Sequence, residues 1–294
     1  MEGKQRFLIL GGTGFLGRYF ANNLVDSALV HTSGRNLNKI QSGQIGLELT
    51  KYSEPDLARI FSRNSFSHVI NCVALADIEQ CEQFPEQADW LNRALPSLLA
   101  RLSLKHGFQL IHISTDAVFD GSKPNRTEND SPKPTNRYSE TKLAGELEVL
   151  ETNPSALIAR VNFVGEHPRQ KSLFDFFQQN LTARNQIKGY SNVYFTPLWA
   201  TETVRIVIEL VSKSKSGIFH VVGSNRISKY EFGCIVADHL NIARSHIEPI
   251  EFLNSKGAPI RSLDLSLSNE KLKRTGIELH EIEASLKTFV SAAH

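Results

Sequence analysis

The most constraining feature of this chain is a run near its N-terminus, Phe7–Gly17, in which four apolar residues lead directly into a glycine cluster. The apolar residues Phe7–Leu10 predict a buried strand, and the segment Arg18–Val25 after the glycines has helical spacing. A glycine-rich turn between a strand and a helix presents backbone N–H groups to an anion, and the helix dipole favours that charge. The run therefore predicts an α/β fold that begins with a phosphate-binding turn.

The spacing of the glycines narrows the ligand. Gly12, Gly14 and Gly17 fit G-x-G-x-x-G. Gly11, Gly14 and Gly17 also fit the looser G-x-x-G-x-x-G. Such a match alone is weak, because glycine also serves tight βα turns that bind nothing. The strand–turn–helix context favours a dinucleotide site. The residues predicted to hold the dinucleotide here are Gly11, Gly12, Thr13, Gly14, Phe15, Leu16 and Gly17.

Strand-like and helical segments alternate along the first two-thirds of the chain, which predicts a doubly wound parallel sheet, a Rossmann fold. The expected strands are Phe7–Leu10, Ala28–Thr32, Gly46–Leu49, His68–Val73, Leu110–Ser114, Ala156–Val161 and Ile218–Val222. The expected helices are Arg18–Val25, Pro55–Arg63, Gln87–His106, Asn136–Leu150 and Thr201–Ser212. We expect residues 1–164 and 201–222 to form the dinucleotide-binding domain. Residues 165–200 and 223–294 are expected to form a smaller, interleaved C-terminal lobe that binds substrate.

Composition excludes several other classes of protein. Among 294 residues, 33 basic and 31 acidic side chains give a net charge of +2, so no nucleic-acid or membrane surface is expected. No apolar stretch is long enough to span a bilayer, and no signal peptide is expected, because Glu2, Lys4 and Arg6 lead straight into the first strand. The three cysteines are too few for a disulfide framework or a metal cluster, which favours a reducing, cytoplasmic location and no metal.

The end of the second strand bears on the choice of nicotinamide cofactor. A site that prefers NAD usually places a carboxylate there for the ribose 2′-OH, but the segment Val30–Asn36 contains none. Ser33 and Arg35 are instead suited to a 2′-phosphate, so NADP(H) is favoured over NAD(H). The alternative is that Arg35 only solvates a loop.

Two further strand ends are expected to contact the cofactor. Glu48 and Leu49, at the end of the third strand, are placed near the adenine. The backbone of Cys72, Val73 and Ala74, at the end of the fourth strand, is expected to line the cofactor ribose.

A reactive constellation follows the fifth strand. Thr115 ends that strand, and Tyr138 and Lys142 lie four positions apart at the start of a helix, so they share one helix face. An ammonium beside a phenol, together with the positive charge of an oxidised nicotinamide, favours the phenolate and is expected to pull the pKa of Tyr138 towards the working pH. We predict that Tyr138 exchanges a proton with a substrate oxygen, that Thr115 holds that oxygen, and that Lys142 orients the cofactor ribose. Taken alone, Tyr-x-x-x-Lys is more often a solvated helix face.

At this point the chain resembles an extended short-chain dehydrogenase/reductase, and more narrowly the dTDP-4-dehydrorhamnose reductase family. The resemblance covers nearly the whole chain, and its most specific string is Ser114–Gly121. The other matching pieces are Gly11–Gly17, Asn71–Ala74, Tyr138–Glu146, Ala159–Val161, Thr196–Pro197, Thr201–Val204, Gly217–Val221, Arg261–Leu267 and Lys271–Leu272.

The resemblance implies reduction of the keto group of a nucleotide-linked deoxysugar with NADPH or NADH, catalysed by Thr115, Tyr138 and Lys142. For the sugar nucleotide it points to Thr115, Phe163, Val164, Trp199 and Arg261, with Arg261 as a clamp on the diphosphate. Arg205 was a weaker candidate, and Trp199 has the alternative of a place in the core.

Departures from the family pattern keep other functions open. Ser191–Phe195, Ser262 and Ala117 all differ from the usual residues where the sugar nucleotide is read. A nucleotide-sugar epimerase or dehydratase is one alternative, although a 4,6-dehydratase would carry glutamate at the position of Ala117. A non-catalytic NADP-binding regulatory subunit is another, against which the intact Thr115, Tyr138 and Lys142 argue. Whether the chain forms a homodimer stays open.

Overall fold

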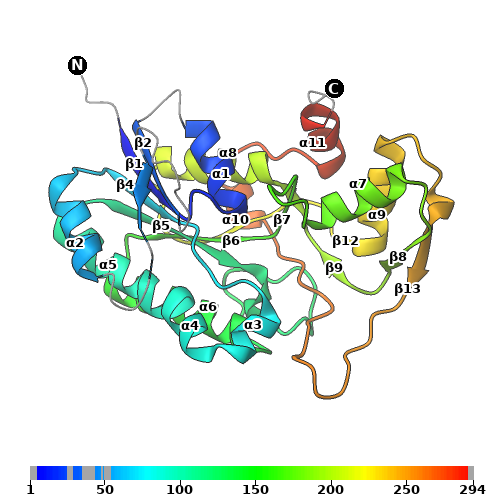
Figure 1. Cartoon of the computed structure of the whole chain (residues 1–294), viewed down its shortest axis with the longest axis horizontal. Coiled ribbons are helices and arrows are strands. Elements are labelled where there is room, and N and C mark those ends of the chain that lie inside the picture. The colour runs from blue at the N-terminus through cyan, green and yellow to red at the C-terminus, as the bar shows by residue number, and fades with distance from the viewer. Residues whose placement is uncertain (1–4, 25–28, 35–43, 48, 50–53, 291–294) are drawn as a thin grey trace.

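A computed structural model describes residues 5–24, 29–34, 44–47, 49 and 54–290 of the chain, and its centre is a seven-stranded parallel sheet (Figure 1). The strand order is β11-β6-β5-β4-β1-β2-β3, which confirms the doubly wound parallel sheet expected from the sequence. The strands are β1 (Arg6–Leu10), β2 (Leu29–Gly34), β3 (Gln44–Gly46), β4 (His68–Asn71), β5 (Gln109–Thr115), β6 (Leu157–Val161) and β11 (Gly217–Val221). The third strand thus ends before Leu49, earlier than predicted.

Helices cover both faces of this sheet, because the side chains on both sides of β1 are buried. Phe7 and Ile9 pack on one face with α1 (Phe15–Leu24) and α8 (Ala200–Ser212). Leu8 and Leu10 pack on the other face, whose helices are α2 (Glu54–Arg63), α5 (Leu95–His106) and α6 (Arg137–Thr152). A strand buried on both sides is continuously apolar, which explains the run that opens the sequence.

The long helix predicted over Gln87–His106 is divided in the structure. It consists of α4 (Pro85–Asp89), a π-helical turn η1 (Trp90–Ala94) and α5. The wide turn carries the buried Asn92, whose side chain bonds to the backbone of Leu75 in both directions and donates to the Thr141 hydroxyl. Turns of this kind are frequent at functional sites, and this one braces α6 through Thr141.

The remaining segments form a smaller lobe at the C-terminal edge of the sheet (Figure 1). Its core contains Phe174, Phe177, Trp199 and Phe232. Its larger helices are α7 (Leu173–Thr182), α9 (Lys229–His239) and α11 (Ile282–Phe289). Its strands form three pairs: β7 (Phe163–Val164) with β10 (Leu198–Trp199), β9 (Tyr194–Phe195) with β12 (Ile227–Ser228), and β8 (Ile187–Tyr190) with β13 (Ile247–Ile250). The shorter helices of the chain are α3 (Ile78–Gln83), η2 (Asp116–Val118), η3 (Arg244–His246) and α10 (Glu270–Lys273). In the described part of the chain no helix is both long and apolar enough to cross a membrane.

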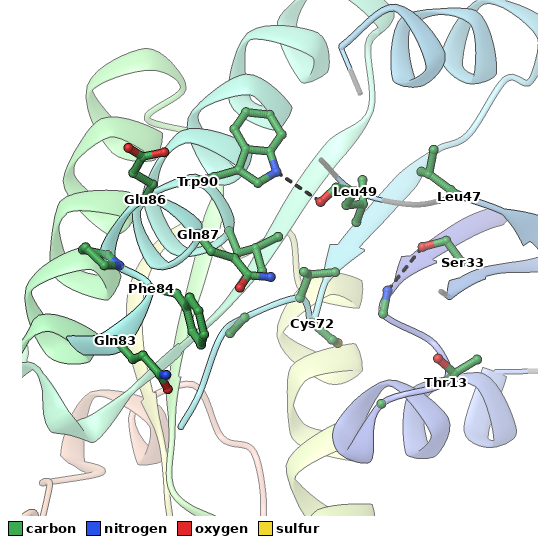
Figure 2. Close-up of a pocket in the computed structure, with 16 residues that line it drawn as sticks. Thr13, Ser33, Leu47, Leu49, Cys72, Gln83, Phe84, Glu86, Gln87 and Trp90 are labelled. Carbon is green, nitrogen blue, oxygen red and sulfur yellow. Dashed lines mark hydrogen bonds between the residues drawn. The ribbon is translucent and has the colours of Figure 1, made fainter. Parts of the chain in front are cut away.

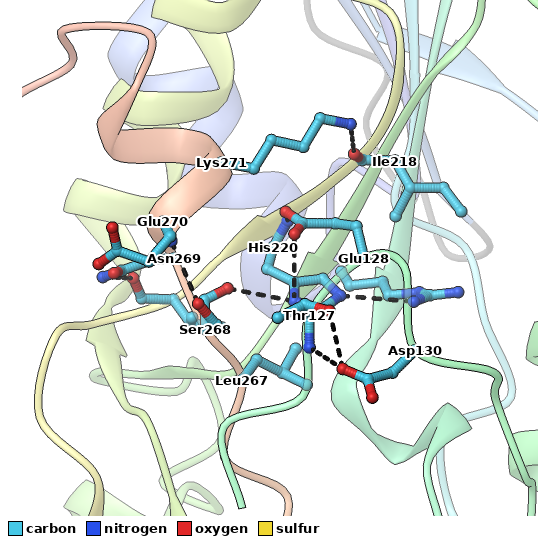
Figure 3. Close-up of polar contacts among 12 residues, drawn as sticks. Thr127, Glu128, Asp130, Ile218, His220, Leu267, Ser268, Asn269, Glu270 and Lys271 are labelled. Atoms are coloured by element: carbon cyan, nitrogen blue, oxygen red, sulfur yellow. Dashed lines mark hydrogen bonds and ion pairs between the residues drawn. The ribbon is translucent and has the colours of Figure 1, made fainter.

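The loop after β5, residues 122–136, is fixed by the C-terminal segment although its composition predicts an exposed loop. Arg126 exchanges backbone hydrogen bonds with Ser266 and Ser268. The Glu128 carboxylate accepts from the backbone N–H of His220 at 2.9 Å, as Figure 3 shows. Lys271 in turn donates to the carbonyl of Ile218 in the same strand, at 2.6 Å. Three segments distant in sequence are therefore interlocked beside β5 and β11.

Candidate active site

The glycine turn has the backbone geometry that an anion-binding cradle needs. Gly11 has φ of +79°, and its carbonyl accepts from the N–H of Gly14 at 2.8 Å. A Cβ at Gly17 would lie 2.2 Å from that same carbonyl, so only glycine allows α1 to begin so close to the turn. The N-terminus of α1 therefore stands open to a phosphate group.

A cavity of about 710 Å³ lies against this turn (Figure 2). It is large enough for a small-molecule cofactor. Its walls include the following residues that the sequence had assigned to the cofactor: Gly11, Thr13, Gly14, Ser33, Leu49, Cys72, Val73 and Ala74. The other predicted cofactor residues of the turn, Gly12, Phe15, Leu16 and Gly17, complete its backbone or begin α1. Arg35 and Glu48, the remaining two assignments of the second and third strand ends, lie outside the described residues.

Ser33 has a structural task in this cavity. Its side chain is 1% exposed and its hydroxyl oxygen accepts from the N–H of Gly11 at 3.3 Å, while its carbonyl accepts from Gly12 at 2.9 Å. Ser33 thus holds the glycine turn in place, and the hydroxyl proton is left for a ligand.

The opposite wall of the cavity was not found from the sequence. It consists of Gln83–Gln87 with Trp90 and Leu91, and the Trp90 indole donates to the carbonyl of Leu49 at 3.2 Å (Figure 2). This hydrogen bond joins the π-helical turn to the end of the sheet. No motif marks these residues, and their role follows only from the way α3 and α4 lie over the sheet edge.

The structure brings the three predicted catalytic residues together. Asn136 and Ser139 form a capping box at the start of α6, which fixes the helix one residue before Tyr138. The Tyr138 hydroxyl faces Thr115 at the end of β5, close enough for the two side chains to interact. Lys142, one turn further along α6, is 2% exposed and donates to the carbonyl of Ile113 at 2.7 Å.

Burial governs the protonation of this centre in the absence of a cofactor. Desolvation raises the pKa of Tyr138 to about 12, and the interaction with Thr115 only partly opposes it. Lys142 does not pull the phenol towards neutrality, because its ammonium is directed to Ile113 and to His112, 3.4 Å away. Burial lowers the pKa of Lys142 to about 8. The phenol therefore keeps its proton at neutral pH, the state that a proton donor needs.

A carboxyl group, Asp116, joins the centre although the sequence reasoning gave it no role. It accepts from the Thr115 hydroxyl at 3.0 Å and from the side-chain amide of Asn162. Burial raises the pKa of Asp116 to about 6, and the nearby Lys229 of the lobe opposes this rise. The Ser-Thr-Asp string was visible in the sequence, but Lys229, more than 100 residues further on, carries no local signal.

A second cavity, of about 830 Å³, lies in the lobe. It is lined by aromatic and cationic side chains: Phe176, Phe177, Tyr190, Phe252, Lys188, Lys229 and Arg261. Tyr190 and Phe252 meet edge to face with ring centroids 5.2 Å apart. The predicted clamp Arg261 is paired with Glu79 of α3 at 2.5 Å, so it bridges the lobe to the sheet domain.

The other residues predicted for the substrate are placed differently. Phe163 is half-buried and packs edge to face on Phe15 at the start of α1, 5.0 Å between centroids. Val164 and Trp199 are 3% and 2% exposed, and they pack in the core of the lobe and line neither cavity. Trp199 therefore packs against Phe174 in the core, which is the alternative that the sequence had left open for it. Arg205 is held by Glu202, Glu209 and the carbonyl of Glu278.

The described residues contain no group of three or more side chains suited to hold a metal ion. The cysteines Cys72, Cys81 and Cys234 are all free thiols. Burial raises the pKa of Cys72, beside Lys142, to about 12, so this thiol stays protonated on the cavity wall.

The parallel sheet, the glycine turn and the Tyr138–Lys142 pair beside Thr115 define the class of protein, an extended short-chain dehydrogenase/reductase. The family profile described as the RmlD substrate binding domain matches residues 5–294. The chain belongs to this family.

The relatives of this chain include proteins of two kinds. The chain is 31% identical over 285 residues to methionine adenosyltransferase 2 subunit beta of Mus musculus, covering 93% of this chain and 83% of that one. It is 35% identical over 170 residues to the probable low-salt glycan biosynthesis reductase Agl14 of Haloferax volcanii, covering 56% and 57% of the two chains.

Solved structures agree on the fold. A hypothetical dTDP-4-dehydrorhamnose reductase from Sulfolobus tokodaii has a TM-score of 0.81 at 28% identity, covering 92% of this chain and 94% of the other. The dTDP-4-dehydrorhamnose reductase of Bacillus anthracis, solved in complex with NADP, has a TM-score of 0.86 at 21% identity, covering 99% and 100%.

Proposed function

We propose that this protein is an NADP-dependent reductase that converts the keto group of a nucleotide-linked deoxysugar into an alcohol. The observation that carries the proposal is that Tyr138 and Lys142 of α6 meet Thr115 of β5 at one centre. This centre lies between the glycine-turn cavity and the lobe cavity, and one neighbouring side chain links it to each cavity. Lys142 interacts with Cys72 on the wall of the glycine-turn cavity, and Asp116 interacts with Lys229 on the wall of the lobe cavity.

The glycine-turn cavity suits a nicotinamide dinucleotide, because the φ of Gly11 and the absence of a side chain at Gly17 let α1 begin directly at the turn, where its N-terminus can meet a diphosphate. Such a cofactor, when bound in its reduced form, supplies a hydride. We infer NADP(H) rather than NAD(H) because the described end of β2 carries Ser33 and no carboxylate. Residues 1–164 and 201–222 would form the cofactor domain, and residues 165–200 and 223–294 the substrate lobe.

The chain's own residues supply the proton and the orientation. The protonated phenol of Tyr138 donates to the substrate oxygen, which becomes the alcohol. The Thr115 hydroxyl, fixed by the backbone N–H of Ala117 at 3.2 Å, holds that oxygen in place. The Lys142 ammonium, held by Ile113, positions the cofactor ribose.

The lobe cavity supports a nucleotide-linked substrate. Tyr190 and Phe252 offer apolar faces for a base, and Arg261 and Lys229 offer cations for a diphosphate. To engage a diphosphate fully, Arg261 exchanges part of its pairing with Glu79 for the substrate.

The test replaces Tyr138 with Phe and follows oxidation of NADPH at the nicotinamide absorbance with a panel of nucleotide-linked keto-sugars. Loss of the proton donor is expected to lower kcat by about 100-fold or more, with NADPH affinity unchanged. Tyr230→Phe, in α9 and not among the residues that line either cavity, is the matched control and should keep full activity. Equal activity of Tyr138→Phe and the parent would contradict the mechanism.

A second candidate function is that of a regulatory subunit, favoured by the similarity to methionine adenosyltransferase 2 subunit beta. It would keep the cofactor cavity without turnover. Parent protein that binds NADPH, oxidises it with no member of the panel and alters the rate of a purified methionine adenosyltransferase catalytic subunit would support this function instead.

A further inference from the structure

A short segment of the lobe is fastened to the sheet domain through each of its residues. These are Ile260, Arg261 and Ser262, and we call the segment the strap. The carbonyl of Ile260 accepts from the side-chain amide of Asn136 at 2.9 Å, and the Ser262 hydroxyl donates to the carbonyl of Phe119 at 3.0 Å. Arg261 forms the ion pair with α3 described above, and both it and Ser262 line the lobe cavity. The sheet domain therefore fixes the position of this part of the cavity wall.

Asn136 serves the strap and the helix of the proton donor with one side chain. Its amide oxygen accepts from the N–H of Ser139 at 3.0 Å and so caps α6, while its amide nitrogen donates to Ile260. Asn136 is only 8% exposed, so water competes little for these bonds. Tyr138 lies in the first turn of the helix that is capped in this way. One amide thus fixes both the start of the helix that carries the phenol and the strap that carries Arg261.

The other two attachments of the strap are of a different kind. Arg261 and Glu79 are both about half exposed, so water screens their ion pair and a substrate anion can readily replace it. The Ser262 bond leads to the loop after β5, where Gly121 has φ of +73° and a Cβ would lie 3.1 Å from the Cβ of Ser262. Neither of these pairs includes a residue of α6, so the bond from Asn136 is the one that relates the strap to the helix of Tyr138.

We propose that Asn136 is a positioning residue for the substrate, which holds Arg261, through Ile260, at a fixed place relative to Tyr138. The proposal rests on the reductase function proposed above. A diphosphate bound by Arg261 then brings the attached keto-sugar to the phenol, because one amide fixes both the anchor and the proton donor. Such alignment matters because a small misplacement of the reacting groups lowers the rate strongly.

Two substitutions of Asn136 separate its two tasks. Asn136→Asp keeps an oxygen for the N–H of Ser139, and aspartate caps helices about as well as asparagine, but it has no donor for the carbonyl of Ile260. Asn136→Ser does the same without adding a charge. The matched control is Asn64→Asp, which removes an equivalent 2.9 Å bond from an asparagine amide to the carbonyl of Ile60. Asn64 is not among the residues that line either cavity.

The first experiment measures the strap without turnover, by hydrogen exchange and mass spectrometry of the parent, Asn136→Asp and Asn64→Asp. The N–H of Arg261, which donates to Asn254 at 2.8 Å, reports on the strap. In Asn136→Asp the strap should exchange about 5-fold faster, as the loss of one hydrogen bond predicts, while the first turn of α6 keeps the protection of the parent. The control should match the parent in both segments.

Two results of this experiment would contradict the proposal. Exchange of the strap that is unchanged in Asn136→Asp would mean that the amide does not hold it. Exchange that becomes faster by the same factor in the strap and in the first turn of α6 would mean that Asn136 acts only as a helix cap.

The second experiment is a double-mutant cycle of Asn136→Asp with Arg261→Gln, measured as kcat/KM for reduction of a keto-sugar nucleotide by NADPH. Asn136→Asp alone should lower kcat/KM about 10-fold, with NADPH affinity unchanged. In the background of Arg261→Gln the anchor is already lost, so the same substitution should have little further effect. A residue that only supports α6 would lower kcat/KM by the same factor in both backgrounds, and that result would overturn the proposal.

The failure of this proposal and the failure of the reductase function give different results. An active parent in which the two substitutions act independently overturns the positioning role and leaves the reductase function standing. A parent that reduces no keto-sugar nucleotide overturns the reductase function and the positioning role with it. Should Asn136→Asp fail to fold, Asn136→Ser decides both measurements.

Discussion

The two cavities of this protein are built in different ways. One side of the glycine-turn cavity is formed at the ends of neighbouring parallel strands and includes Gly11 and Gly14 of the glycine turn. The lobe cavity is formed by side chains that reach it from segments between Leu173 and Ser262. The first kind of site is determined by local conformation and tolerates little change, whereas the second depends on which side chains happen to meet and adapts readily to new substrates.

The largest expected effect tests the glycine-turn cavity, whose shape depends on the backbone of the turn. Gly17→Val places a Cβ where the carbonyl of Gly11 stands 2.2 Å away, so the turn must move. We expect NADPH affinity to fall about 100-fold, as overpacking of this size predicts, while binding of a dTDP-sugar to the lobe is unchanged. Calorimetry with each ligand measures this, and Asn22→Ala on the exposed face of α1 is the control. Equal losses for both ligands would mean that the two cavities do not act separately.

A smaller expected effect tests the lobe cavity, which is formed by side chains. Arg261→Gln removes a charge-assisted contact to the substrate diphosphate, so KM for the keto-sugar nucleotide should rise roughly 10-fold, with kcat and NADPH affinity nearly unchanged. Glu79→Gln is the matched control, since it removes the partner of Arg261 and leaves the guanidinium free for substrate. A KM that does not change in Arg261→Gln would remove the lobe cavity from substrate binding.

The smallest expected effect tests whether the wall from α3 and α4 belongs to the cofactor-binding part of the glycine-turn cavity. Trp90→Phe keeps the aromatic wall but removes the hydrogen bond to the carbonyl of Leu49. One such bond contributes about 1 kcal/mol, so the NADPH dissociation constant should rise roughly 5-fold, with no effect on KM for the sugar nucleotide. Fluorescence titration with NADPH measures the change. A dissociation constant equal to that of the parent would show that the wall from α3 and α4 does not contact the cofactor.

The sequence was sufficient to predict the features that arise from local spacing. The apolar run Phe7–Leu10 and the glycines after it predicted β1, the turn and the start of α1, because each follows from backbone conformation and strand burial. The four-residue spacing of Tyr138 and Lys142 placed both on one face of α6, and the strand end supplied Thr115.

Features that depend on distant packing were not predictable in this way. Lys229 reaches Asp116 from the other lobe, and the wall Gln83–Gln87 acquires its role only when α3 and α4 fold over the sheet edge. An aromatic residue such as Trp199 looks the same in sequence whether it faces a ligand or the core. The π-helical turn at Trp90–Ala94 was missed because its residues have ordinary helical character, and tertiary contacts of Asn92 accompany the wider turn.

The interlocked segments behind β5 have a consequence for the order in which the protein matures. Synthesis starts at the N-terminus, so the Ser-Thr-Asp strand end and its loop leave the ribosome well before Ser266, Ser268 and Lys271, which secure them. A nascent chain or a shortened fragment that stops before these residues carries the glycine turn, Thr115, Tyr138 and Lys142 and still lacks the contacts that secure the loop after β5.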